Sequence, residues 1–228
     1  MRNRGTERSV ALGMKSHIGW AAVVAVAGPA ESAEVVARRR IDMATTFAEG
    51  AVYHAGQKLD VQRAEALILS SEEKFERTAR DALLDLAAAL RNAGCQPVAA
   101  GVLAGSGKPL PPLPSILKSH ALVHAAEGEL YRRVLIRATE GCQIPPLRVP
   151  EKEIEMRAAA ALGIVPARLS AWLLALGKVA GKPWTKDHKQ AAMAAWIALA
   201  SREPGPARER GPPENGPAKR SVLRETAL

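Results

Sequence analysis

The chain has 228 residues, of which 47% are apolar and 4% aromatic, and its formal net charge is +9. The apolar content excludes an intrinsically disordered chain and is enough for one domain with a buried core. The positive charge favours anionic partners such as DNA or RNA, although a role in solubility explains it equally well.

Short runs of apolar and β-branched residues predict five strands in the first two thirds of the chain. The predicted strands cover residues 10–12, 18–27, 34–43, 97–104 and 147–149. Residues 13–17 contain glycine, lysine, serine and histidine and are expected to form a turn, as are residues 28–31.

Apolar positions that recur every three or four residues predict a long amphipathic helix over residues 61–92, with Asp60 as its N-cap. A second helix is expected to begin after Ser115 and to end near Glu140. Three further helices are predicted over residues 151–162, 166–179 and 186–201, the last one capped by Thr185.

One domain is therefore expected over residues 9–201. Residues 1–8 are expected to be flexible, and the basic, proline- and glycine-rich residues 202–228 to be a disordered tail. No apolar run reaches the 18 or so residues of a membrane helix, so a cytoplasmic protein is expected. The alternative is a signal peptide, with the apolar residues 18–27 as its hydrophobic region. The two cysteines form no CxxC pair, which excludes a zinc ribbon.

Two segments carry a resemblance to a known family. Residues 10–24, VALGMKSHIGWAAVV, are similar to the first hairpin of the bacterial Holliday-junction resolvases, and residues 185–196, TKDHKQAAMAAW, resemble their last helix. The order of the predicted elements also resembles the RNase H-like fold of that family. The resemblance implies an α/β domain in which a mixed sheet, a three-strand antiparallel meander followed by strand–helix alternation, is flanked by helices.

In the resolvases, four acidic residues hold two divalent cations that activate water for phosphodiester hydrolysis. The resemblance places these acids at Gly13, near Gly101, at Asp187 and at Gln190 of this chain. One remaining carboxylate cannot replace an acidic site for two Mg²⁺ ions. Cleavage by the family's mechanism is therefore not expected, and whether any catalysis survives stays open.

Histidines offer a different chemistry. His120, His124 and Glu127 lie four and three residues apart, so they share one face of the second predicted helix and form a candidate site for a divalent transition metal. In the implied fold His17, Asp187 and His188 could approach them. The residues with a predicted catalytic role are His17, His124, Asp187 and His188. The alternative is that all of these are ordinary surface residues.

Six basic residues are predicted to contact nucleic-acid phosphates: Lys15, Arg38, Arg40, Arg132, Arg133 and Lys186. The run of three arginines at residues 38–40 could equally protect an exposed sheet edge from pairing. Three functions follow from the sequence. A non-catalytic RNase H-like protein that binds nucleic acid or a nucleotide is favoured, a metal-dependent hydrolase with a histidine-rich site is the first alternative, and a protein–protein adaptor is the second.

Overall fold

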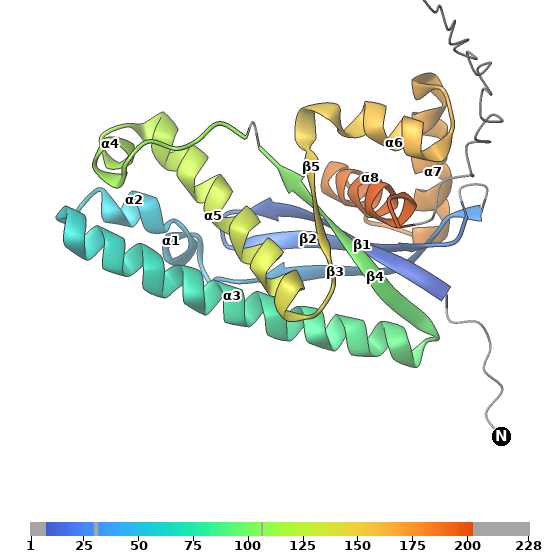
Figure 1. The fold of residues 1–228 in the computed structure, drawn as a ribbon, viewed down its shortest axis with the longest axis horizontal. Helices are drawn as coiled ribbons and strands as arrows, with labels where there is room; N and C mark the ends of the chain where they lie inside the picture. Colours follow the sequence, from blue (N-terminus) through green and yellow to red (C-terminus); the bar gives the residue numbers. More distant parts are fainter. Residues whose placement is uncertain (1–7, 30–31, 106, 203–228) are drawn as a thin grey trace, which may run out of the picture.

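The centre of the sheet is strand β1 (Arg8–His17), which has a partner strand on each side. It pairs antiparallel with β2 (Trp20–Ala27), which pairs antiparallel with β3 (Glu34–Asp42). On its other side it pairs parallel with β4 (Cys95–Ala104), which pairs parallel with β5 (Pro146–Pro150). The order β3-β2-β1-β4-β5 is that of an RNase H-like mixed sheet, which confirms the expected fold class (Figure 1).

This computed structural model describes residues 8–29, 32–105 and 107–202. Almost all of the two terminal segments that were expected to be flexible lies outside the described residues. The apolar run considered as a signal-peptide core is β2, which is buried along nearly its whole length.

The expected turn at residues 13–17 is wrong. Strand β1 continues through this segment to His17, because Gly13 to His17 all pair with β2. The turn lies after it, at Ile18 and Gly19, and Gly19 adopts a φ of +79° that favours glycine.

The five predicted helices are present in the predicted order, four of them with shifted ends, and the structure adds three short helices, α1, α2 and α4, in segments predicted to be connections. The helices are α1 (Phe47–Gly50), α2 (Val52–Gly56), α3 (Val61–Asn92), α4 (Leu113–Leu117), α5 (His120–Gly141), α6 (Ile154–Leu162), α7 (Leu169–Ala180) and α8 (Lys186–Ala200), with short 3₁₀ turns η2 (Glu151–Glu153) and η3 (Pro166–Arg168). Asp60 and Thr185 cap α3 and α8 as predicted. Ser115 was the wrong cap for the second long helix: the chain breaks after α4, and the Ser119 hydroxyl accepts the hydrogen bond that starts α5.

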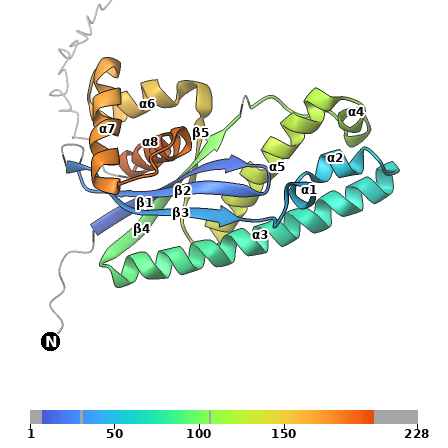
Figure 2. The ribbon, with the colours of Figure 1, turned by 180° about the vertical axis from the view of Figure 1, so that it is seen from behind.

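Helices cover both faces of the sheet. One core joins alternate side chains of β1, including Leu12 and Met14, to α3 and α5. A second core joins the opposite face to α6, α7 and α8. Seen from the front and from behind, α6–α8 lie together on one side of the sheet, while α3 runs along the other (Figures 1 and 2).

Helix α8 packs on two glycines of the central strands. Gly13 of β1 and Gly101 of β4 lie opposite each other in the parallel ladder. A Cβ atom on Gly13 would lie 1.7 Å from the Ala191 carbonyl oxygen, and one on Gly101 would lie 2.1 Å from the Ala194 carbonyl oxygen. The helix backbone therefore occupies the space where side chains of these two residues would stand, and any residue larger than glycine would displace it.

Among the described residues, no single helix is long and apolar enough to cross a membrane. The segments Glu151–Leu162 and Pro166–Ala180 pass that test only as a pair, and they meet at a bend of 94°.

Replacing Gly13 or Gly101 with alanine is expected to lower the free energy of unfolding by about 3 kcal/mol, since the added methyl group meets helix backbone that cannot rotate away. Urea denaturation followed by circular dichroism measures the change. Ser9→Ala, at the exposed start of the same strand, is the matched control and should stay within about 0.5 kcal/mol. Unchanged stability in both glycine variants would show that α8 does not rest on the sheet as described.

Candidate functional site

The corner where β1 ends and α8 begins contains a buried network of charged and polar groups. Lys15 Nζ lies 2.6 Å from Glu151 Oε2, and Gln190 Nε2 donates to Glu151 Oε1 at 3.2 Å. Burial opposes ionisation of Glu151, but the hydrogen bond and charge of Lys15, with the hydrogen bond from Gln190, outweigh it and hold the pKa of Glu151 below its ordinary value. Glu151 is therefore an ionised carboxylate whose counter-ion is an ammonium group.

A second pairing of a basic and an acidic side chain lies two residues further along β1. His17 Nε2 is 3.2 Å from Asp187 Oδ1 in the first turn of α8, close enough for an ion pair but not aligned as a hydrogen bond. The His17 ring stacks on Trp20 with centroids 4.2 Å apart. Strand β1 thus presents two basic side chains, two residues apart, to the two acids at this corner.

These residues do not fit the two-metal site that the resemblance implies. Two of the expected acids are glycines buried under α8, and a third is Gln190, an amide bonded to Glu151. The carboxylates nearest to the end of β1, those of Glu151 and Asp187, each face a basic group of the protein. Mg²⁺ needs several free oxygen ligands, and a lysine ammonium 2.6 Å from one carboxylate repels it.

A basic groove lies between the edge strand β3 and the start of α8. Two adjoining cavities of about 340 and 290 Å³ share the lining residues Arg39, Arg40, Pro183 and His188. Arg38 lines only the first cavity and donates to the carbonyl oxygens of Gly181 and Pro183, so it holds β3 to the segment before α8.

Arg39 and Arg40 are the exposed cations of this groove. The Arg39 guanidinium donates only to the Arg38 carbonyl, and no acidic partner is found for it in the described part of the chain. Arg40 lies 3.9 Å above the centre of the Trp20 ring and bonds to Asp42 at 2.7 Å. Trp20 is therefore in contact with both the His17 ring and the Arg40 guanidinium.

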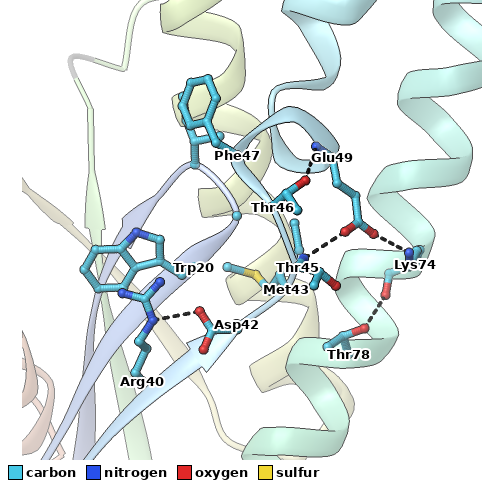
Figure 3. A pocket seen from close by; sticks show the side chains of 13 residues that line it. Trp20, Arg40, Asp42, Met43, Thr45, Thr46, Phe47, Glu49, Lys74 and Thr78 are labelled. Atoms are coloured by element: carbon cyan, nitrogen blue, oxygen red, sulfur yellow. Dashed lines mark hydrogen bonds and ion pairs between the residues drawn. The ribbon is translucent and has the colours of Figure 1, made fainter.

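A larger cavity of about 700 Å³ continues from Trp20 and Arg40 towards α1 and α3. Figure 3 shows its polar wall, where Glu49 bonds to Lys74 and to the Thr45 amide. The hydrogen bond from Lys74, followed by that from Thr45, lowers the pKa of Glu49 to about 2. Phe47 lies at this cavity with 67% of its surface exposed.

The other side of the same corner is more acidic. A cavity of about 550 Å³ at the ends of β4 and β5 is lined by three glutamates, at positions 151, 153 and 155, against two lysines, Lys152 and Lys186. An anionic ligand is therefore attracted to the β3 side of α8 rather than to the β5 side.

Some of the six basic residues predicted to contact phosphate are paired with acidic side chains of the protein, and others are exposed. Arg133 binds the buried Glu72 through two nitrogens at 3.0 and 2.9 Å, and this hydrogen bonding raises its pKa. Arg132 lies 3.6 Å from Glu129, and Lys15 pairs with Glu151. Lys186 is exposed at the start of α8, beside the acidic cavity.

His188 has a structural position at the start of α8. Its Nδ1 accepts a hydrogen bond from the Thr185 amide, which completes a capping box, and its ring stacks on Trp184. Burial, and then the charge of Arg38, lower its pKa, although Asp187 acts in the opposite direction. A neutral ring is what this cap requires, because Nδ1 must keep its lone pair.

The expected meeting of all the histidine segments is wrong. His17 and His188 both lie near Asp187, whereas His120 and His124 meet His54 of α2 instead. Glu127 is fully buried behind this second group and bonds to His54.

Sequence reasoning missed three residues of these sites: His54, Glu151 and the ring partner Trp20. A possible signal for Glu151 was its position directly after a predicted strand, since the carboxyl ends of parallel strands meet at one edge. His54 follows no motif, because its neighbours in space come from a helix some seventy residues away.

Known proteins provide only a distant comparison. No protein-family model matches the chain, and no curated protein matches it. Among solved structures it is similar to Thermus thermophilus RuvC in complex with a Holliday junction substrate, at 10% identity over 83% of this chain and 91% of that chain, with a TM-score of 0.49. It is also similar to a second Thermus thermophilus RuvC structure, at 9% identity over 82% of this chain and 92% of that one, with the same TM-score. At this distance no residue role is transferred.

Replacing Lys15 with alanine should raise the pKa of Glu151. Burial disfavours the ionised form, and the variant lacks the hydrogen bond and the positive charge of Lys15 that stabilise it. Carboxyl-carbon NMR titration of the protein measures this pKa. Arg157→Ala removes an exposed partner of Glu153 and should leave the pKa of Glu151 unchanged. An unshifted pKa in the Lys15 variant would contradict the pairing.

Proposed function

We propose that this protein binds nucleic acid through the basic groove between β3 and α8, and that it does not cleave it by the two-metal mechanism of the resolvases. The observation that carries the proposal is the pair of exposed cations, Arg39 and Arg40, at cavities beside the N-terminus of a long helix. Helix N-termini and arginines both attract phosphate.

The charge distribution supports a phosphate ligand on this side. Arg38 fixes the strand that carries Arg39 and Arg40, so these two guanidinium groups are held at a defined place on the edge of the sheet. Lys74 and Phe47 extend the surface past Trp20. The net charge of +9 adds a long-range attraction for polyanions.

The contacts favour the sugar–phosphate backbone over the bases. Trp20 already stacks with His17 and Arg40, so it is not a free platform for a base. Phe47 is one exposed ring, whereas proteins that stack successive bases use several. Binding with little sequence preference and a strong dependence on salt is therefore expected.

The absence of cleavage follows from the same corner. The backbone of α8 fills the space above Gly13 and Gly101, and the ammonium of Lys15 neutralises Glu151. A single substitution to an acid at either glycine cannot rebuild the site, because its side chain has no room beneath the helix.

The double substitution Arg39→Ala, Arg40→Ala should weaken binding to labelled DNA roughly tenfold at low salt and reduce the slope of log K against log salt by about 2. Fluorescence anisotropy with a duplex, a four-way junction and a single-stranded RNA measures both quantities and distinguishes the three ligands. Incubation of each nucleic acid with the protein and Mg²⁺ should leave the nucleic acid uncleaved.

Arg91→Ala is the matched control, because Arg91 is exposed near the end of α3, on the opposite face of the sheet. It should bind like the parent protein. An equal loss per removed charge in the control and in the double variant would indicate general charge attraction and overturn the groove as the site. Mg²⁺-dependent cleavage that is lost in a Glu151→Gln, Asp187→Asn variant would overturn the non-catalytic part of the proposal.

A further inference from the structure

Three histidines from two helices converge away from the basic groove. His120 and His124 lie on the first two turns of α5, and His54 lies on α2. One ring nitrogen from each lies within 4.8 Å of the others. The ring planes are inclined by 70–80° to one another, so the rings meet through their edges rather than stacking. The three rings pack edge to face, and one nitrogen of each is close enough to the others to share a ligand.

The two histidines of α5 lie within hydrogen-bond distance of each other through their Nε2 atoms, so a proton or a metal ion lies between these nitrogens. His124 Nε2 lies 3.0 Å from His120 Nε2. Facing lone pairs repel at this distance unless a proton or a cation lies between them. Nitrogen atoms bound to one tetrahedral Zn²⁺ at 2.0–2.1 Å lie about 3.3 Å apart, so a small opening of this pair accommodates the ion.

A buried carboxylate orients the third histidine. Glu127 is 0% exposed, and its Oε2 lies 2.9 Å from His54 Nδ1, while its Oε1 accepts from the His54 amide at 3.3 Å. With a proton on Nδ1, the lone pair of His54 is on Nε2, the other edge of the ring. A carboxylate that fixes a histidine in this way is typical of metal sites, where it also raises the basicity of the ligand.

The charges around the group fit a soft or borderline divalent cation. Glu127 supplies negative charge from inside the protein. Three imidazoles suit Zn²⁺, Co²⁺, Ni²⁺ or Cu²⁺, whereas Mg²⁺ and Ca²⁺ require oxygen ligands.

We infer that His54, His120 and His124 together bind one divalent transition-metal ion of the zinc class, with Glu127 as a positioning residue for His54. His120 and His124 are exposed and His54 is half-buried, so the fourth position of the ion faces solvent. The site joins α2 to α5 and does not depend on the proposed nucleic-acid binding. Glu127, which the sequence suggested as a metal ligand, instead holds His54 in place through hydrogen bonds to its ring and its amide.

The test is titration of the untagged, metal-free full-length protein with Zn²⁺ by isothermal calorimetry, and with Co²⁺ by visible absorption. One ion per chain and the intense visible bands of four-coordinate Co²⁺ are expected. His54→Ala, His120→Ala and His124→Ala should each weaken Zn²⁺ binding more than tenfold. Glu127→Gln should weaken it roughly 10- to 100-fold, as substitution of an orienting carboxylate does.

His188→Gln is the control, because it removes a histidine outside the cluster and should keep the parent's affinity. Circular dichroism of each variant checks folding, and Glu127→Gln keeps an oxygen that can accept from His54. Absence of stoichiometric Zn²⁺ binding in the parent overturns the inference. Binding that is unchanged in His54→Ala also overturns it, since the ion would then be held by the α5 pair alone.

Discussion

Helix α8 rests on the backbone of the two central strands at Gly13 and Gly101, and this contact determines which side chains the corner between β1, β4 and α8 can contain. Strand β1 has neighbours on both sides and buried faces above and below, so it cannot move to make room. The alanine-rich face of α8 lets helix and sheet approach closely. Side chains at these two strand positions are excluded by the same packing that holds the two layers together.

Because α8 packs directly on the two glycines, the charged side chains of this corner lie around the edge of that contact, which we call the rim. Beyond the glycines, Lys15 and His17 leave β1 on the side of α8 and meet Glu151 and Asp187. This corner is therefore lined by basic side chains of β1, with the Lys15 ammonium paired to Glu151 and the His17 imidazole beside Asp187. The rim joins a groove whose exposed cations, Arg39 and Arg40, come from the edge strand.

The histidine group of α2 and α5 lies in the helical layer on the other face of the sheet. Its arrangement depends on the buried carboxylate of Glu127. Glu127 has no exposed surface, and a buried carboxylate is costly unless it is hydrogen-bonded. His54 provides that bond with both its ring and its amide. Because this bond uses Nδ1, the nitrogen that His54 has left for a ligand shared with His120 and His124 is Nε2. The two sites are therefore built independently, one from charge pairs and one from imidazoles.

Local sequence patterns predicted most of the strands and the longer helices of this protein, and they showed which acidic residues are missing. The bounds of α3, the caps Asp60 and Thr185, and the absence of acids along the first hairpin could all be read from the chain, because periodicity and capping act over a few residues. Only the tertiary structure decided that β1 runs through residues 13–17, that Glu151 pairs with Lys15, and that His54 completes the histidine group. Each of these depends on contacts between residues far apart in the sequence, and such contacts leave no periodic or local signal.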